Sequence, residues 1–98
     1  NSAADALAQA LQQGAISLSL RDYAGFEKVG SLGRRFPTGD SRMTARPGDL
    51  MLYQGNQLVL FYGSNTWSYT RLGHIDDLTG WAEALGGGDV TVILSLKN

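Results

Sequence analysis

The sequence predicts a mainly β fold: a β-barrel with two short capping helices. Its apolar residues fall in short runs that mostly alternate with polar residues, as in half-buried strands. Turn-forming residues separate these runs, and only two segments space their apolar residues as a helix does. A chain of 98 residues that is 43% hydrophobic and 17% charged has the size and composition of one globular unit. We therefore expect residues 1–98 to form a single domain.

The first predicted element is a helix over residues 2–13. Ser2 suits the N-cap, because its hydroxyl can accept a hydrogen bond from a free N–H of the first turn. Leu7 and Leu11 lie four positions apart and share the face that should pack against the rest of the domain. Gly14 suits the end of the helix.

Two strands and a loop are expected next. Residues 15–20 alternate strictly between apolar and polar or small side chains, which predicts a half-buried strand. Asp22 and Gly25 supply a turn before a weaker strand over residues 26–32. Residues 33–48 are polar and rich in Arg and Gly, which predicts a long structured loop with a functional role.

A β-hairpin is predicted from residues 49–53 and 57–62, with its turn at Gln54-Gly55-Asn56. Both faces are apolar over residues 58–61, so this strand should be covered on both sides. Residues 63–68 are predicted to form a loop, and a strand is expected over residues 69–72.

The last part of the chain predicts a short helix followed by a strand. The helix is expected to start after a capping aspartate and to end at a run of glycines, with one apolar face. The final strand is predicted from alternating apolar residues. The caps considered are Asp76 and Asp77, the shared face holds Leu78, Trp81, Ala82 and Leu85, the glycines are Gly86, Gly87 and Gly88, and the strand residues are Val90, Val92, Leu94 and Leu96.

Composition excludes several classes of function. The chain has no Cys, so disulfides, thiolate catalysis and cysteine-bound zinc are excluded. A net charge of −1 with scattered Arg residues argues against nucleic-acid binding, and no apolar run approaches the ~20 residues of a membrane helix. With one His and no acidic calcium loop, we predict no metal and no cofactor. The compartment, cytoplasmic or exported, stays open.

No catalytic set is predicted. A Ser–His nucleophilic pair would have to use His74, the only histidine, and no nucleophile elbow is present. We interpret His74 as a residue at a strand end whose ring is satisfied locally. The glycines before Asp89 follow a helix instead of opening one, so they do not predict a phosphate site.

Several strings along nearly the whole chain resemble the bacterial cyclophilin-like domain of small proteins of unknown function. The most specific of them are Pro47-Gly48-Asp49-Leu50, Gly55-Asn56-Gln57-Leu58, Leu60-Phe61-Tyr62 and Leu72-Gly73-His74-Ile75-Asp76. The resemblance implies a small closed β-barrel with helices at its ends. Relatives usually begin with a β-hairpin ahead of the first helix, and this sequence starts at the helix. Either those strands belong to a longer chain, or the barrel is open at one edge, and we expect such an edge to be covered by a symmetric partner or by a rearrangement.

The resemblance implies no activity. Prolyl isomerases of the cyclophilin fold carry a Phe-His-Arg cluster and a Gln-Gly-Gly-Asp-Phe string. The most similar strings here, Tyr53-Gln54-Gly55-Asn56 and Arg34-Arg35-Phe36, match neither pattern.

Two surfaces are candidates for binding. Aromatic residues crowd between positions 53 and 69, and aromatic rings with a nearby guanidinium suit a peptide or a planar ligand. The alternative is that they fill the barrel. Trp67, expected on a loop, is interpreted as a contact residue or lid. The second surface is the Arg-rich segment Arg34, Arg35 and Arg42 with Phe36, and the alternative there is a solvated loop with salt bridges to Asp40 and Asp49.

We therefore expect a non-enzymatic module that binds a small molecule or a peptide between the Arg-rich loop and the loop of Trp67. One alternative is a weak prolyl isomerase with Phe36 or Phe61 as the proline slot and Arg35 or Arg71 as the donor. Another is a structural module that pairs through an open strand edge, as in a homodimer. The candidate ligand-binding residues are Arg35, Phe36, Phe61, Tyr62, Trp67, Tyr69, Arg71 and His74.

Overall fold

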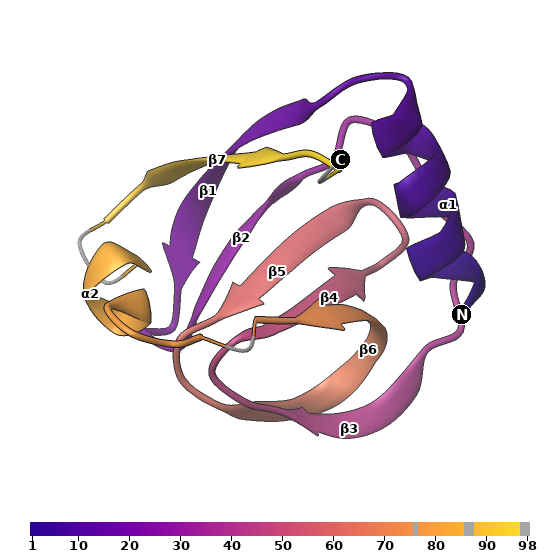
Figure 1. Ribbon diagram of the computed structural model, residues 1–98. Coiled ribbons are helices and arrows are strands. Elements are labelled where there is room, and N and C mark those ends of the chain that lie inside the picture. Colours follow the sequence, from indigo (N-terminus) through magenta and orange to yellow (C-terminus); the bar gives the residue numbers. More distant parts are fainter. Residues whose placement is uncertain (76, 86–87, 97–98) are drawn as a thin grey trace.

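Seven strands and two helices make up the structure, a computed structural model that describes residues 1–75, 77–85 and 88–96 (Figure 1). The strands form one antiparallel sheet in the order β3-β6-β4-β5-β2-β1-β7. The mainly β fold class is therefore confirmed. The elements are α1 (Ser2–Gln12), β1 (Ile16–Tyr23), β2 (Glu27–Ser31), β3 (Ser41–Ala45), β4 (Asp49–Tyr53), β5 (Gln57–Phe61), β6 (Asn65–His74), α2 (Trp81–Leu85) and β7 (Val90–Leu94).

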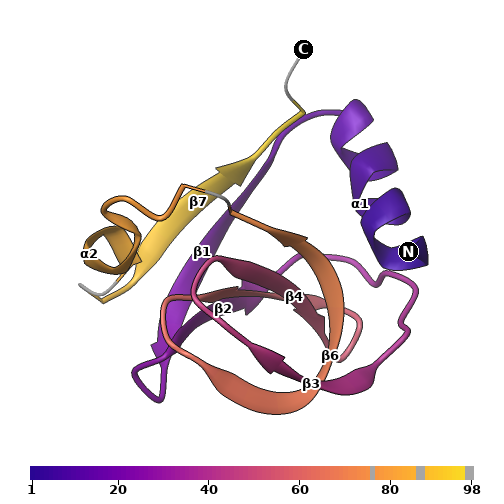
Figure 2. The same ribbon diagram turned by 60° about the horizontal axis from the view of Figure 1, so that its bottom comes forward.

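The sheet separates two apolar cores, one on each face. Strand β5 shows this most clearly, because Leu58 and Leu60 join the first core while Val59 and Phe61 join the second. All four side chains of this strand are buried, as the apolar run predicted. Helix α1 packs against the first core, at one end of the curled sheet, and α2 lies near β7 (Figure 2). The second core lies on the opposite face, where it forms the floor of the site described below.

Helix α1 differs from its prediction in its cap and in its buried face. The N-cap is Asn1 instead of Ser2, because the Asn1 side chain accepts the hydrogen bond from a first-turn N–H. Ala3 is the fully buried residue and Leu7 packs beside it, whereas Leu11 is only partly buried. The helix is therefore rotated toward its alanines, which allows its backbone to approach the core closely.

Two predicted loops contain strand residues. The long loop over 33–48 includes β3, and the loop over 63–68 belongs mostly to the ten-residue strand β6, which extends to His74. The two strands pair with each other, with Met43 opposite Trp67. Arg42-Met43-Thr44-Ala45 and Thr66-Trp67-Ser68-Tyr69 each alternate polar with apolar or aromatic residues, so a strand pattern was present that the loop predictions missed. Trp67 therefore lies on a strand.

The hairpin of β4 and β5 is confirmed, and so is the strand beginning at Ile16, which runs on to Tyr23. The last helix begins at Trp81, later than the predicted capping residues, and Asp77 instead accepts a hydrogen bond from the Thr79 N–H before it. The predicted strand near the end of the chain is confirmed as β7. Asp76, Gly86 and Gly87 lie outside the described residues, and so does the side chain of Ala82.

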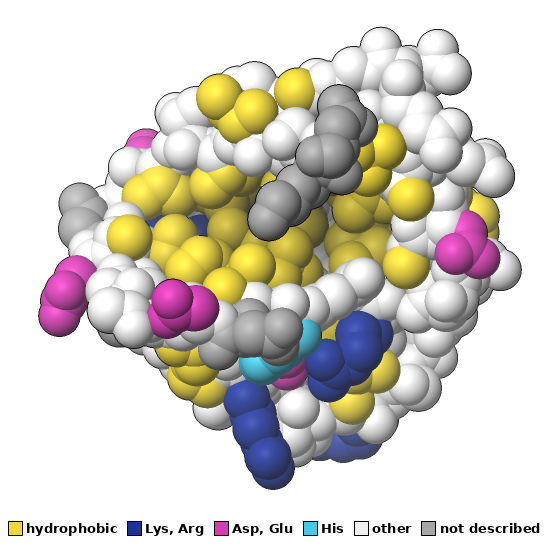
Figure 3. Space-filling model, in the orientation of Figure 1, with side chains coloured by type: hydrophobic (Ala, Val, Ile, Leu, Met, Phe, Trp, Pro, Cys, Tyr) yellow, Lys and Arg dark blue, Asp and Glu magenta, His cyan; other side chains and the backbone are white. Residues whose placement is uncertain are grey.

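The sheet does not close into a barrel within the described part of the chain. Strands β3 and β7 are its two ends, and neither is paired with the other. The closed barrel that the resemblance implied is therefore not formed by these residues, whereas the open strand edge that was expected for this chain is present among them. In Figure 3 the surface between α1, β7 and the end of β6 is hollowed and largely apolar. Neither described helix has the length and apolar character that crossing a bilayer would need.

Candidate functional site

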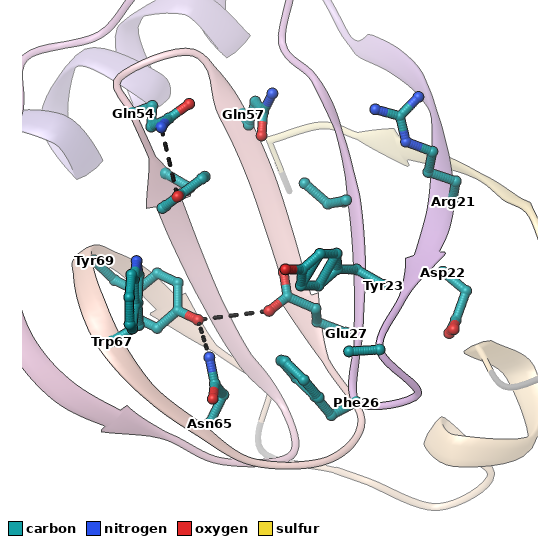
Figure 4. Close-up of a pocket in the computed structure, with 13 residues that line it drawn as sticks. Arg21, Asp22, Tyr23, Phe26, Glu27, Gln54, Gln57, Asn65, Trp67 and Tyr69 are labelled. Carbon is teal, nitrogen blue, oxygen red and sulfur yellow. Dashed lines mark hydrogen bonds between the residues drawn. The ribbon is translucent and has the colours of Figure 1, made fainter.

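A cavity of about 580 Å³ lies on the face of the sheet that carries the second core (Figure 4). Its volume falls within the range of small-molecule pockets. Antiparallel register creates it, because residues directly opposite each other share a face. Tyr23 of β1 lies opposite Glu27 of β2, and Glu27 lies opposite Phe61 of β5. The walls come from the end of β1, from β2, from the turn between β4 and β5, and from β6.

Five aromatic rings form a continuous row along this face. Their centroids are separated by 5.9 Å from Tyr23 to Phe26, 6.3 Å from Phe26 to Phe61, 5.4 Å from Phe61 to Tyr69 and 6.1 Å from Tyr69 to Tyr53. Four of the five line the cavity, and Phe61 lies fully buried beneath them. These distances are typical of stabilising aromatic pairs, so the row forms a well-ordered wall.

Glu27 is the one carboxylic acid buried within this aromatic wall. It is 6% exposed, and its side chain points into the cavity between Tyr69, Tyr23 and Phe26 (Figure 4). In the ranges that the structure describes, no Lys, Arg or His forms an ion pair with it. Burial raises the pKa of Glu27 to about 7, although the Tyr69 hydroxyl opposes the rise. Glu27 is therefore both a proton acceptor and a proton donor near neutral pH.

A short hydrogen-bond chain holds Glu27 in place. The Asn65 Nδ2 donates to the Tyr69 hydroxyl at 2.9 Å, and that hydroxyl donates to the Glu27 Oε1 at 3.5 Å (Figure 4). Burial raises the pKa of the Tyr69 hydroxyl, the Asn65 hydrogen bond lowers it, and the charge of Glu27 raises it further. Tyr69 therefore stays protonated and keeps donating to the carboxylate.

The rim of the cavity combines exposed aromatic side chains with polar groups. Tyr23 is 57% exposed and the indole of Trp67 is 51% exposed, and both line the cavity (Figure 4). Arg21, Gln54 and Gln57 complete the rim on the side of β1 and the β4–β5 turn. Access to Glu27 therefore passes exposed aromatic side chains and several hydrogen-bonding groups.

Two of the residues predicted for ligand binding line this cavity, namely Trp67 and Tyr69. Phe61 supports the floor, but it is fully buried and offers no surface to a ligand. Phe36 is also buried, in the first core, on the other face of the sheet. Since both phenylalanines are buried, neither forms the exposed proline slot that the isomerase alternative required. Arg35 donates a hydrogen bond to the Gln54 carbonyl at 3.2 Å.

The remaining predicted residues lie in two other clusters. The His74 Nδ1 lies 2.7 Å from the Asp49 Oδ1, and the Arg71 Nη1 lies 3.2 Å from the same oxygen. Burial raises the pKa of Asp49, but hydrogen bonds from the Arg46 N–H and from His74, together with the charge of Arg71, hold it below its ordinary value. His74 ends β6 and its ring is satisfied locally, as interpreted from the sequence. Asp49 therefore forms its ion pair with Arg71, and among the described residues no arginine of the Arg-rich loop forms the salt bridge that was expected with Asp49.

Tyr62 belongs to a cluster around the buried Lys28. Its hydroxyl donates to Asp22, and Asp22 forms an ion pair of 3.3 Å with the Lys28 ammonium. The ammonium also lies 5.6 Å from the centre of the Tyr62 ring and donates to the Gly88 carbonyl. The hydrogen bond from Tyr62 is the main cause of a lowered Asp22 pKa, with Lys28 adding to it. This cluster links β2 to the segment before β7.

Sequence reasoning missed Glu27, the residue at the centre of the site. Its signal was a Glu-Lys pair inside a predicted strand, which implies that two opposite charges project to opposite faces. Tyr23 and Asn65 were missed as well, because only the register brings them to this cavity, whereas Tyr53 belonged to the predicted aromatic cluster but not to the candidate list. Within the described residues, no three acidic or histidine side chains gather as metal ligands would.

The sequence model of the cyclophilin-like family matches residues 1–95. The chain belongs to the cyclophilin-like family. The resemblance seen in the sequence is thereby confirmed, over almost the whole length of the chain. No curated protein and no solved structure is significantly similar to it. Membership in the cyclophilin-like family concerns the fold and not the function, because one fold can support many functions that depend on its individual sites.

Proposed function

We propose that this cyclophilin-like domain is a non-enzymatic binding module that takes a small molecule or a peptide side chain into the cavity around Glu27. The observation that supports it is a buried carboxyl group without an ion-pair partner among the described residues, set within a row of aromatic rings. Burying such a group costs free energy, so its retention inside a pocket points to a partner from outside. Apolar walls with a few placed polar groups are typical of ligand pockets.

Trp67 gives this proposal a direct test. Because its indole is half-exposed at the rim, its removal should leave the fold intact while taking away a contact surface. Amide spectra of labelled protein would be recorded with a library of small aromatic and aliphatic fragments and with short peptides. We expect shifts grouped on β2 and β6, and about tenfold weaker binding by Trp67→Ala.

The matched control is Leu78→Ala, since Leu78 is an exposed apolar residue between β6 and α2 that does not line the cavity. It should bind as tightly as the parent. Binding by Trp67→Ala that equals the parent's, or shifts grouped away from β2 and β6, would refute the proposed site. The same samples with X-Pro peptides also report any accelerated cis–trans exchange, which would argue for an isomerase instead.

A second candidate function is self-association through β7. Apolar side chains around the first core stay partly exposed, among them Leu7 of α1, Leu72 of β6 and Val92 of β7. Figure 3 shows the hollowed apolar surface between these elements. Strand β7 pairs with β1 on one edge, and in the described part of the chain no strand pairs with the other. An unpaired strand edge beside an apolar hollow favours addition of a strand.

The occupant proposed for this edge is the β7 of a second copy. An antiparallel pair centred on Val92 places Val92 opposite its own counterpart and Val90 opposite Leu94, so inward apolar residues meet one another. In this register Ile93, which is 69% exposed on the other face of β7, lies opposite Thr91 of the second copy. Sedimentation over a wide concentration range should show a reversible dimer in the parent and a monomer in Ile93→Lys. A parent that remains monomeric at every concentration would refute this candidate.

A further inference from the structure

We infer that the ligand of the Glu27 cavity is an organic cation, an alkyl- or quaternary ammonium group that meets the Glu27 carboxylate against the aromatic wall. This inference rests on the proposed binding function and names the chemical class of its ligand. It follows from three features of the cavity: the charge, the ring faces and the surrounding polar groups.

The charge is the first feature. Glu27 is almost completely buried, and its one hydrogen bond within the described residues is the long one, 3.5 Å, from the Tyr69 hydroxyl. A carboxylate has room for about four hydrogen bonds, so most of its capacity is unused. A ligand ammonium group would supply the missing positive charge, and the apolar surroundings would strengthen the attraction.

The aromatic rings are the second feature. Tyr53 and Tyr69 pack at an interplanar angle of 59°, and Trp67, two positions from Tyr69 on β6, also lines the cavity. Rings at such angles form the sides of a cage instead of a flat stack. The faces of Trp and Tyr attract cations, and cages of such rings recognise quaternary ammonium groups. Neutral apolar ligands would gain the contact area of the cage without this attraction.

The other polar groups of the cavity are the third feature. Tyr69 keeps its proton because its pKa is raised, chiefly by burial, and Arg21 and Asp22 at the β1 side are of opposite charge. Asp22 is already engaged by Lys28 and Tyr62. Glu27, with its pKa raised by burial to about 7, is therefore the group whose charge changes near neutral pH. Binding of a cation should strengthen as the pH rises through this value.

The experiment compares cations with neutral molecules of the same shape. Choline is paired with 3,3-dimethyl-1-butanol, and benzylammonium with benzyl alcohol, each titrated into the labelled domain at about pH 8, above the Glu27 pKa. We expect each cation to bind about tenfold more tightly than its neutral counterpart, with amide shifts centred on β2 and β6. Glu27→Gln keeps the shape of the side chain and should remove most of this preference. Glu83→Gln, an exposed position on α2, is the matched control and should retain it.

The possible outcomes separate the two proposals. Cation preference that disappears in Glu27→Gln and persists in Glu83→Gln supports the ligand class. Equal binding of cations and neutral counterparts at the cavity overturns it and leaves the binding function standing. Cation preference that survives Glu27→Gln overturns the role of Glu27. Absence of shifts with all four probes, while fragments of other classes do shift β2 and β6, also overturns the cation class. Absence of shifts with every compound refutes the binding function as well.

Discussion

Glu27→Gln should stabilise this domain in a strongly pH-dependent way. The carboxyl group is buried between aromatic rings, and burial raises its pKa from an ordinary value of 4.5 to about 7. A raised acid pKa means that the native state holds the proton more tightly than the unfolded chain does. The contribution of Glu27 to stability is therefore fully present below about pH 4.5 and is lost as the pH rises through about 7.

The magnitude follows from the same two values. At 1.36 kcal/mol per pH unit, a rise from 4.5 to about 7 corresponds to about 3 kcal/mol of stability lost by the time Glu27 is fully ionised. Glutamine has a similar shape, does not ionise, and can still accept the hydrogen bond from Tyr69. We expect the variant to match the parent near pH 4.5 and to exceed it by about 3 kcal/mol above pH 8.

The assay is urea unfolding of both proteins across this pH range, with the free energy of unfolding plotted against pH. Other acidic groups such as Asp49, whose pKa is lowered, affect both proteins equally and cancel in the difference. Glu83→Gln is the control and should follow the parent at every pH. If the free energies of unfolding of the parent and of Glu27→Gln differ by the same amount at every pH, Glu27 does not have the raised pKa that burial without an ion-pair partner predicts.

Three further changes test other parts of the structure. Gly30→Ala should lower stability by about 3 kcal/mol or prevent folding, since a Cβ there would overlap a backbone carbonyl of β1. Gly73→Ala, on another strand with open space around it, should cost little. Equal melting temperatures of the two variants would contradict the close approach at Gly30. Lys28→Ala should lower the free energy of unfolding by about 3 kcal/mol in urea, because it empties a fully buried site and removes the ion pair of Asp22. Lys28→Met, which fills the site, should lower it less. Equal losses in the two variants would show that packing at this site does not matter. Tyr69→Phe should raise the Glu27 pKa further in a carboxyl carbon NMR titration, as it removes the opposing hydrogen bond, and an unchanged pKa would refute that contact.

The parts of the fold that sequence could predict are those with a strong local pattern. The alternation from Ile16 to Leu20 predicted strand β1 and its buried face. The run of apolar residues on both faces of β5 predicted that strand and its burial on both sides. Strand β3 and the first half of β6 also alternate, with Met43 opposite Trp67 on one face, but the Gly, Pro and Asn residues around them favoured loops. The pairing of these two distant segments, which the local pattern does not reveal, makes them strands.

The candidate site was harder to predict than the fold for a related reason. Trp67 and Tyr69 were predicted because aromatic crowding is visible along the chain. Glu27 becomes significant only once the sheet register has buried it beside Tyr69, a residue 42 positions away. A carboxyl group in a short strand gives no local indication of whether solvent or aromatic rings will surround it. Three-dimensional context therefore decided the chemistry of this site.

Strand β2 carries two neighbouring buried charges of opposite sign, Glu27 on one face of the sheet and Lys28 on the other. In a strand, a slip of one residue exchanges the two faces. Such a slip would separate the Lys28 ammonium group from Asp22 and would move the Glu27 carboxylate toward Asp22, where like charges repel. Apolar residues of similar size would tolerate the exchange far better. The two opposite charges therefore favour one register of β2 between its neighbouring strands. Glu27, the charged group of the cavity, thus also helps the sheet to form with the correct strand alignment.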